Sequence, residues 1–240
     1  MKGRELGIGA IALALGAGGA VLAASMSATP VNTADRAAIE KIVREYILAN
    51  PELLPEAMEN LEAKAAGKAV TDNRAAIETP FGSAWEGATN GDVTLVQFFD
   101  YNCGYCRTAR ADIDRLLSED PKLKIVYREV PILGPDSVKA TEASLAVAQG
   151  GGNYPAFHRA LYAAGRTTGS AISSARAKAG AKGGGDSARV AAEIDANVEL
   201  MRTLQFTGTP AWVVGDKVFN GAVGYDALKA AIAEVRAKSS

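Results

Sequence analysis

The two cysteines of this chain lie close together. Cys103 and Cys106 are the only cysteines among 240 residues, and only Gly104 and Tyr105 separate them. Thiols at this spacing can close a disulfide with little backbone movement, and a thiolate can exchange such a bond with another molecule. A bridge that serves stability usually joins distant segments, because its stabilising effect grows with the length of the closed loop. The spacing therefore favours reactive cysteines over a structural disulfide.

The residues around the pair predict a helix that would make one thiol acidic. A turn at 100–102 is followed by a predicted helix from Cys103 to about Leu117. Free N–H groups and the helix dipole at a helix N-terminus stabilise negative charge, so they would lower the pKa of Cys103. Cys106 would lie one turn deeper and be less exposed. We therefore assign Cys103 as the sulfur that attacks a substrate or is attacked by it.

Metal binding is the alternative use of the same two thiolates, which can hold a soft ion such as Cu(I). A closed zinc site normally needs four ligands, and with its one histidine the chain offers three Cys or His side chains. We therefore predict no resident metal site and keep Cu(I) binding as the alternative function. His158 follows Phe157 in a predicted helix, and we interpret it as a packing or surface residue.

Composition and charge exclude other classes of protein. Hydrophobic residues make up 48% of the chain and charged residues 22%, as in an ordinary globular protein and unlike a disordered one. The net charge is −1 and the Lys and Arg residues are dispersed, so nucleic-acid binding has no electrostatic support.

The segment 1–28 has the features of an export signal or an N-terminal anchor. Lys2 and Arg4 precede an apolar stretch from Leu6 to Ala24 that ends in small residues. If the signal is cleaved, the protein is released as a soluble molecule into the periplasm or another extracytoplasmic space. If it is retained, residues 6–24 are almost long enough to span a bilayer, which takes about 20 residues. In both cases the remainder lies in an oxidising compartment, where disulfide chemistry is relevant.

Residues 32–66 have the pattern of two short amphipathic helices separated by Asn50 and Pro51. Two helices of this length cannot bury both apolar faces on each other and form a stable domain. We predict that they associate with copies of themselves and make a homo-oligomer, with docking on the chain's own core as the alternative. Residues 67–79 are interpreted as a linker or a weak connecting helix. The apolar positions are Ile39, Ile42, Val43, Tyr46 and Ile47, then Leu53, Leu54, Ala57, Met58 and Leu61.

Residues 80–240 have the element order of an α/β domain. The sequence predicts strands at 93–99 and 124–130 and a hairpin at 211–219 around Gly215 and Asp216. Helices are expected between the strands, at the C-terminus and in a helical insertion at about 136–204; no element is predicted between 165 and 185. The predicted helices of the insertion are 137–148, 154–164 and 186–204, and the last helix is 225–238.

Four motifs resemble those of a known family: NPELLPEAME at 50–59, FFDYNCGYCR at 98–107, PILGPDS at 131–137 and GTPAWVVGD at 208–216. With the element order, they make the chain similar to exported DsbA-family thiol–disulfide oxidoreductases, and most similar to their ScsC-like group. The resemblance implies an α/β, thioredoxin-like fold with a helical insertion, preceded by a small helical segment. It implies exchange with protein thiols or disulfides as an oxidase or isomerase, and a membrane redox partner of the DsbB or DsbD type. It implies no cofactor beyond the redox-active disulfide itself.

The resemblance also assigns positions that contact the substrate. Thr209 and Pro210 match the loop that faces the disulfide in this fold, with a cis bond before the proline, and Gly208 belongs to the same loop. An extended substrate can pair there in the manner of a β-strand. Gly104 and Tyr105 differ from the spacers of thioredoxin and DsbA, so the resemblance does not define the reduction potential. Tyr105 is expected at the surface beside the substrate.

One position departs from the family pattern. Gln97 stands six residues before Cys103, where thioredoxin and DsbA carry a buried acid. An amide cannot take the proton from Cys106, so we expect water or another group such as Asp100 or Glu129 to accept it. We interpret Gln97 as a residue that tunes this transfer or, alternatively, as a buried amide satisfied by backbone groups. The direction of exchange, oxidase against isomerase or reductase, stays open.

Overall fold

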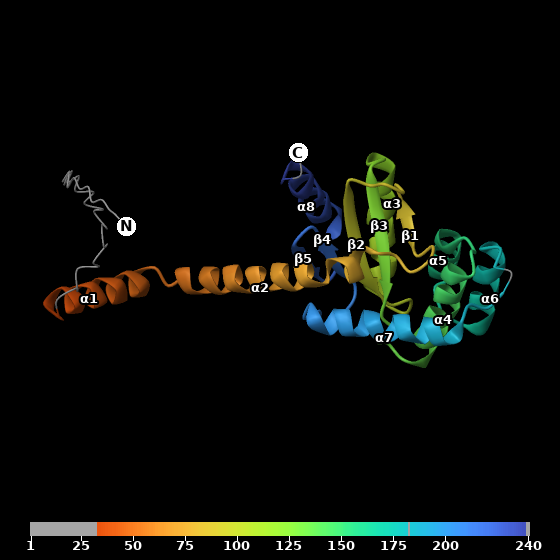
Figure 1. Cartoon of the computed structure of the whole chain (residues 1–240), viewed down its shortest axis with the longest axis horizontal. Coiled ribbons are helices and arrows are strands. Elements are labelled where there is room, and N and C mark those ends of the chain that lie inside the picture. Colours follow the sequence, from red (N-terminus) through yellow and green to blue (C-terminus); the bar gives the residue numbers. More distant parts are fainter. Residues whose placement is uncertain (1–32, 182, 239–240) are drawn as a thin grey trace, which may run out of the picture. The chain divides into compact units, whose positions relative to one another are not determined.

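The computed structural model describes residues 33–181 and 183–238, and the predicted signal or anchor at 1–28 lies outside them (Figure 1). The chain divides into two units, residues 1–51 and 52–240. Among the described residues, no helix is long and apolar enough to cross a membrane.

The described part of the first unit is helix α1 (Thr33–Ala49). The side-chain amide of Asn50 bonds the carbonyl of Tyr46 at 2.8 Å, and Pro51 follows. The apolar side chains of this helix are largely solvent-exposed, with between 50% and 64% of the surface of Ile39, Ile42, Val43 and Tyr46 accessible. The predicted first helix is confirmed, and within the described part of its own unit its apolar stripe has no cover.

The second unit begins with α2 (Leu53–Glu78), whose C-terminal half shows that, of the two alternatives at 67–79, a linker or a connecting helix, the segment is helical. The helix continues through Gly67, and a Cβ atom there would lie 3.3 Å from the carbonyl oxygen of Asp216. The absence of a side chain therefore lets the helix approach the β-hairpin. Val70 and Ile77, seven residues apart on one helix face, are fully buried against the sheet. This burial stabilises as a helix a segment whose own sequence pattern is weak.

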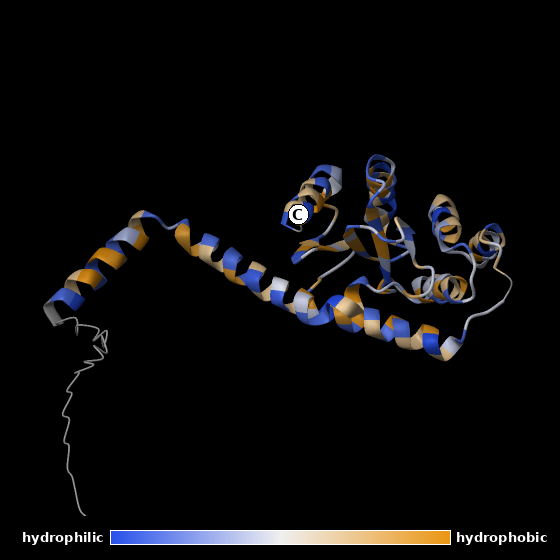
Figure 2. Ribbon diagram, turned by 45° about the horizontal axis from the view of Figure 1, so that its top comes forward, coloured by the Kyte–Doolittle hydropathy of each residue, from blue (hydrophilic) through white to orange (hydrophobic). Residues whose placement is uncertain are grey.

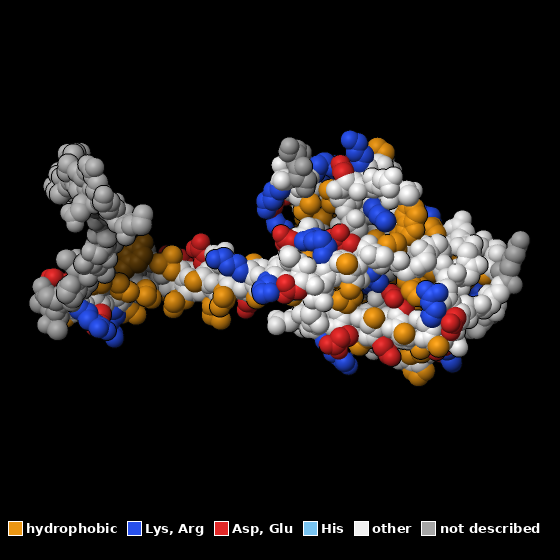
Figure 3. Space-filling model, in the orientation of Figure 1, with side chains coloured by type: hydrophobic (Ala, Val, Ile, Leu, Met, Phe, Trp, Pro, Cys, Tyr) orange, Lys and Arg blue, Asp and Glu red, His pale blue; other side chains and the backbone are white. Residues whose placement is uncertain are grey.

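The N-terminal half of α2 is exposed. Leu54, Met58 and Leu61 have between 55% and 67% of their surface accessible, and Figure 3 shows hydrophobic side chains along this part of the helix. Figure 2 shows hydrophobic residues in both halves of α2. Those near the C-terminal end are buried on one face, whereas those near the N-terminal end lie on a different face and are exposed.

A five-stranded sheet in the order β1-β3-β2-β4-β5 forms the centre of the second unit (Figure 1). Strands β2 and β3 are parallel and the other neighbours are antiparallel. The predicted central strands and hairpin are confirmed; the short edge strand β1 was missed because three residues carry no periodic pattern. The bounds are β1 (Trp85–Gly87), β2 (Val93–Phe99), β3 (Leu123–Glu129), β4 (Ala211–Val214) and β5 (Lys217–Asn220).

Helices cover both faces of the sheet. Leu95 and Phe99 of β2 pack with α3 (Gly104–Glu119) and α8 (Gly224–Lys238), whereas Val96 and Phe98 pack with α2 and α7 (Ser187–Thr203). Because β2 is buried on both sides, its sequence is mostly apolar, with Thr94 and Gln97 as the exceptions, rather than strictly alternating. The helical insertion comprises α4 (Pro135–Gln149), α5 (Tyr154–Ala163), α6 (Gly169–Lys178) and α7.

Local signals predicted the insertion unevenly. Asp186 caps α7 as expected, since its carboxylate accepts the N–H groups of Ala188 and Arg189. Helix α6, capped by Thr168, lies within the segment 165–185, where no element was predicted. Its small residues make a weak apolar pattern, and only Ala175 within it is fully buried.

Candidate functional site

Cys103 is the N-cap residue of α3. Its backbone is extended (φ −74°, ψ 114°), and its Sγ atom accepts the N–H group of Cys106 at 3.2 Å. The N–H group of Cys103 donates to the carbonyl of Asp100 at 3.1 Å, which closes the preceding turn. Both cysteines are buried free thiols. The predicted position of Cys103 at a helix N-terminus is therefore confirmed.

The loop before β4 faces Cys103. The Thr209–Pro210 peptide bond is cis, as the resemblance implied, and the thiol of Cys103 donates to the carbonyl of Thr209 at 3.2 Å. Strand β4 begins directly after Pro210 and pairs with β2, Ala211 opposite Phe98. This antiparallel pairing brings the start of β4 to the end of β2, which leads into the cysteine turn. Gly208 lies in the same loop, with open space beside its Cα atom.

The two thiols have opposite pKa shifts. The pKa of Cys103 falls to about 6, mainly because of the hydrogen bond from the Cys106 thiol, with help from the N–H groups of Cys106 and Tyr105. Burial, followed by the neighbouring Cys103 sulfur, raises the pKa of Cys106. Near neutral pH Cys103 is a thiolate and Cys106 keeps its proton, which is the asymmetry that disulfide exchange requires.

Asp100 holds the cysteine turn, residues 100–102 before Cys103, against a neighbouring loop. Its buried carboxylate accepts the N–H group of Asn102 at 2.7 Å, the N–H group of Leu133 at 2.9 Å and the hydroxyl of Ser137 at 2.7 Å. The turn is thereby fastened to the PILGPDS segment. Three donors bind this carboxylate, so it holds the loop in place. The expectation that Asp100 accepts the proton of Cys106 stays a prediction.

The insertion provides a second attachment that the sequence did not predict. The hydroxyl of Thr167 donates to the side-chain oxygen of Asn102 at 2.7 Å, and Arg107 donates to the carbonyl of Gly165 at 2.7 Å. Residues 165–167 belong to the segment for which no element was predicted. The loop between α5 and α6 thus binds both the cysteine turn, at Asn102, and the first part of α3, at Arg107.

Gln97 is buried in the centre of the sheet, beside Tyr127 of β3 and Trp212 of β4. Neither atom of its side-chain amide has a hydrogen-bond partner among the described residues. The interpretation that backbone groups satisfy this amide is wrong, because the backbone groups of neighbouring strands are used within the sheet. By strand alternation, Gln97 points to the face covered by α3, the helix that carries Cys106.

The two residues between the cysteines are open to the surroundings. Tyr105 has 71% of its surface exposed, as expected, and a side chain at Gly104 would meet no atom within 4 Å. Ile132 and Leu133, in the loop held by Asp100, are also exposed. Exposed residues that a substrate could contact therefore lie beside the buried Cys103.

His158 is a packing residue. It is fully buried among the aromatic rings of α5 and the cysteine turn, with its Nδ1 atom 3.1 Å from the hydroxyl of Tyr101. Burial lowers its pKa, so the ring is neutral. Over the described ranges, no cluster of three or more Cys, His, Asp or Glu side chains is arranged to hold a metal ion.

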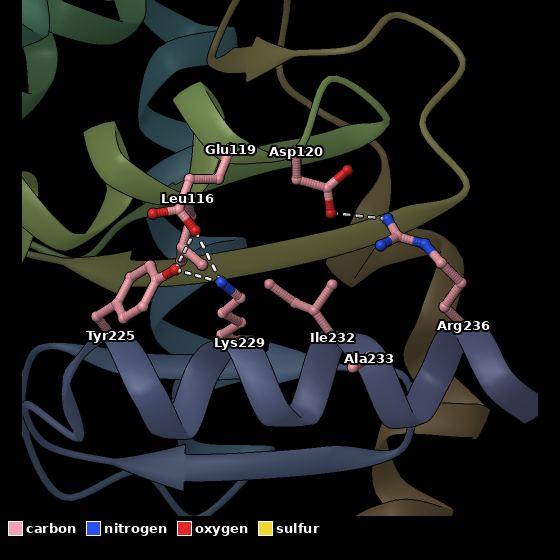
Figure 4. A pocket seen from close by; sticks show the side chains of 8 residues that line it. All are labelled: Leu116, Glu119, Asp120, Tyr225, Lys229, Ile232, Ala233 and Arg236. Carbon is pink, nitrogen blue, oxygen red and sulfur yellow. Dashed lines mark hydrogen bonds and ion pairs between the residues drawn. The ribbon is translucent and has the colours of Figure 1, made fainter.

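A cavity of about 270 Å³ lies at the other end of α3, against α8 (Figure 4). Lys229 reaches Glu119 at 2.8 Å and the hydroxyl of Tyr225 at 2.7 Å, and Arg236 reaches Asp120 at 2.8 Å. Tyr225 also donates to Glu119. These charged groups pair with one another, so we interpret this end of α3 as a clasp between two helices.

Residues 94–233 match the family model described as the DSBA-like thioredoxin domain, and residues 35–67 match the N-terminal domain of copper resistance protein ScsC. A linker-deletion mutant of Proteus mirabilis ScsC is similar at 28% identity and a TM-score of 0.69, over 88% of this chain and 100% of that one. A thioredoxin-like oxidoreductase from Silicibacter pomeroyi DSS-3 shares 37% identity with a TM-score of 0.61, over 70% and 99%. A periplasmic thioredoxin-like protein from Salmonella enterica serovar Typhimurium shares 30%, with a TM-score of 0.63, over 68% and 95%. No curated protein sequence matches the chain.

Proposed function

Because the chain belongs to the DsbA-like thioredoxin family of thiol–disulfide oxidoreductases, we propose that it exchanges disulfides with protein substrates through Cys103 and Cys106. The observation that carries the proposal is the placement of the Cys103 sulfur, which accepts an N–H group at the tip of α3 and lies 3.2 Å from the carbonyl of Thr209 in the cis-proline loop. We propose an extracytoplasmic location, in line with the Salmonella protein described as periplasmic.

The exchange runs in two steps whose direction depends on the starting state. In oxidation, a substrate thiolate attacks Cys103 in the disulfide, and Cys106 leaves and takes up a proton. A second substrate thiolate then attacks the substrate sulfur of the mixed disulfide, and Cys103 leaves as a stable thiolate. In reduction, the Cys103 thiolate attacks a substrate disulfide, and Cys106 resolves the mixed disulfide after losing its proton. In isomerisation, another substrate thiolate attacks the mixed disulfide and Cys103 leaves as a thiolate, with Cys106 as the escape route when no such thiolate attacks. The low pKa of Cys103 makes it the better leaving group.

The substrate is proposed to lie along the loop at 208–210. This loop precedes β4, and its carbonyl at Thr209 faces the reactive sulfur. An extended chain at this edge could form backbone hydrogen bonds, as in strand addition. Tyr105, on the other side of Cys103, would contact the substrate's side chains. Recycling of the pair is assigned to a membrane redox partner of the DsbB or DsbD type.

We propose that the exposed apolar stripes of α1 and the N-terminal half of α2 bring copies of the chain together. The residues that match the ScsC N-terminal domain, 35–67, contain both stripes. Large exposed apolar surfaces on soluble proteins usually mark contacts with other chains. An oligomer presents several Cys103 sites to one misfolded client, so we favour the isomerase mode over the oxidase mode.

Ile42→Glu together with Leu61→Glu tests this proposal on the full chain. We expect the wild type to be oligomeric by light scattering and to recover activity from scrambled ribonuclease, and the variant to be monomeric, with isomerisation lost and dithiol oxidation kept. Arg44→Glu, on an exposed polar position of α1, is the matched control. A monomeric wild type, or an oligomer without isomerase activity, would contradict the proposal.

The reduction potential of the pair separates the redox modes. A value of about −120 mV would identify a strong oxidant, and one of about −270 mV a reductant.

Cu(I) binding is the second candidate function, favoured by two free thiols one helical turn apart and by the copper-resistance description of the matched N-terminal domain. Cu(I) titration of the reduced wild type against Cys106→Ser decides it: tight binding lost in the variant, without protein disulfide turnover, would replace exchange by metal capture.

A further inference from the structure

A cluster of polar side chains lies buried between the end of β3 and helices α4 and α5. Glu129, the last residue of β3, is fully buried, and its Oε1 atom accepts the hydroxyl of Tyr154 at 2.9 Å. Its Oε2 atom has no partner among the described residues, and neither do Oγ1 of Thr141 and Nε2 of His158. Buried polar atoms without partners are uncommon and call for an explanation.

The surroundings of Glu129 keep its carboxyl group protonated. Burial raises its pKa to about 8, against the opposing effect of the hydroxyls of Ser144, Tyr154 and Thr141. The adjacent Arg128 does not compensate, because it points to the opposite face of the sheet and pairs with Glu193 at 2.6 Å. An ionised carboxylate without a cation is costly in a protein core. The titratable or charged groups around Glu129 are Tyr101 from the cysteine turn, Tyr154, His158 and Tyr162 from α5, Tyr127 from β3, and Glu193 from α7.

The carboxyl group and the cysteines share an immediate neighbourhood. Glu129 pairs with Phe99 across the parallel strands, and Phe99 leads directly into the cysteine turn. The hydroxyl of Tyr162 donates to the Asp100 carbonyl at 3.4 Å, the same oxygen that accepts the N–H group of Cys103. Burial raises the pKa of this tyrosine most, followed by electrostatic interactions with Cys106, Tyr101, Cys103 and Glu129. The hydroxyl of Tyr162 thus interacts electrostatically with both sulfurs and with the carboxyl group, in a region where charges are weakly screened.

On the premise of the proposed thiol–disulfide exchange, we propose that Glu129 is a positioning residue that couples the redox state of the Cys103–Cys106 pair to a proton held in the core. When a reductant or substrate dithiol supplies two electrons, the S–S bond breaks, Cys106 gains a proton and Cys103 becomes a thiolate, while the dithiol becomes a disulfide and releases its protons. The new negative charge makes ionisation of Glu129 harder. The carboxyl group therefore takes up a proton on reduction, and releases it on oxidation, at pH values where it would otherwise be ionised.

The redox equilibrium of the full chain with dithiothreitol, measured from about pH 6.5 to about pH 9 and corrected for ionisation of the reagent, tests the coupling. One proton bound for two electrons changes the equilibrium constant about tenfold per pH unit. We expect the equilibrium constant of the wild type to change by more than tenfold per pH unit around pH 8. The equilibrium constant of Glu129→Gln should change about tenfold per pH unit over the whole range. Glu142→Gln, an exposed acid on α4, is the matched control and should keep the wild-type profile.

Two further measurements keep the proposal falsifiable if Glu129→Gln does not fold. Tyr154→Phe removes a hydroxyl that lowers the pKa of Glu129, so the steep region should move to higher pH. The reduced-minus-oxidised infrared spectrum of the wild type should contain a protonated carboxyl band that changes with redox state. A Glu129→Gln profile equal to the wild type, or the absence of that band, overturns the proposal. Dithiothreitol replaces the protein substrate here, so a steep profile without protein turnover would refute only the proposed function.

Discussion

The two ends of helix α3 stabilise negative charge in different ways. At the N-terminus, the Cys103 sulfur accepts a backbone N–H group and lies beside the exposed Tyr105. At the C-terminus, Glu119 and Asp120 are neutralised by Lys229 and Arg236 of α8 (Figure 4). The neighbouring thiol of Cys106 and backbone N–H groups thus stabilise the charge at the reactive end, and side-chain cations stabilise it at the other.

The difference explains why one end reacts and the other does not. The Cys106 thiol and the backbone N–H groups of the helix stabilise the Cys103 thiolate without a cation that would pair with it. The hydrogen bonds from Lys229 and Tyr225, followed by Arg115, lower the pKa of Glu119 to about 2, which keeps this carboxylate ionised and occupied. The same helix therefore combines a site for chemistry with an attachment to the last helix of the domain.

Cys103→Ser tests the reactive end and has the largest expected effect. The serine oxygen can still cap α3, so the fold should persist, whereas its hydroxyl cannot exchange disulfides. We expect insulin reduction and ribonuclease oxidation to fall to the uncatalysed rate, with an unchanged far-UV circular dichroism spectrum. Residual turnover would show that Cys106 is the attacking sulfur.

Cys106→Ser should stop exchange one step later. Cys103 keeps its place at the helix tip and can still form a mixed disulfide, but no second sulfur resolves it. Intact-mass spectrometry should detect a substrate adduct that accumulates on this variant and is absent from Cys103→Ser. Equal adducts on the two variants would contradict the assigned order.

The acidic groups at the two ends of α3 should ionise in different pH ranges, Cys103 near 6 and Glu119 near 2. The pKa of Cys103 in the folded, reduced protein, about 6, lies below its ordinary value of 9.0. Its contribution to stability is therefore complete above about pH 9 and is lost as the pH falls through about 6. Alkylation by iodoacetamide should show a midpoint near 6, and the reduced wild type should lose stability relative to Cys103→Ser as the pH falls from about 9 to about 6. An alkylation midpoint near 9 would show that the N-terminal end of α3 does not stabilise the thiolate. Only the C-terminal end would then stabilise a negative charge, since Glu119 stays ionised throughout this range.

Lys229→Ala tests the clasp and has the smallest expected effect. An ion pair at the surface contributes little to stability, because water and salt screen the attraction between its charges. We expect a small fall in the free energy of unfolding that shrinks in concentrated salt, with unchanged disulfide exchange, measured by urea titration and insulin reduction. Lys139→Ala, which removes an exposed partner of Asp136, is the control. A change in exchange rate would show that the clasp influences the reactive end.

Short stretches of the sequence were enough to predict several elements. The mostly apolar run at 93–99 predicts a strand buried on both faces, and Asp186 predicts the start of α7. The spacing of Cys103 and Cys106 predicts which sulfur lies at the helix tip. Such features depend on hydrogen bonds and side-chain patterns within a few residues, so they can be recognised without the rest of the fold.

Other features depend on residues far apart in the chain. The half of α2 for which the sequence left a linker or a weak helix open is helical because Val70 and Ile77 are buried against the sheet, and the local pattern does not reveal that partner. Cys103 faces Thr209, 106 residues away, only because β2 and β4 pair. The raised pKa of Glu129 likewise follows from its burial at the end of β3, beside α4 and α5. Tertiary packing decided these points, since desolvation and contact act through space and leave no periodic signal along the chain.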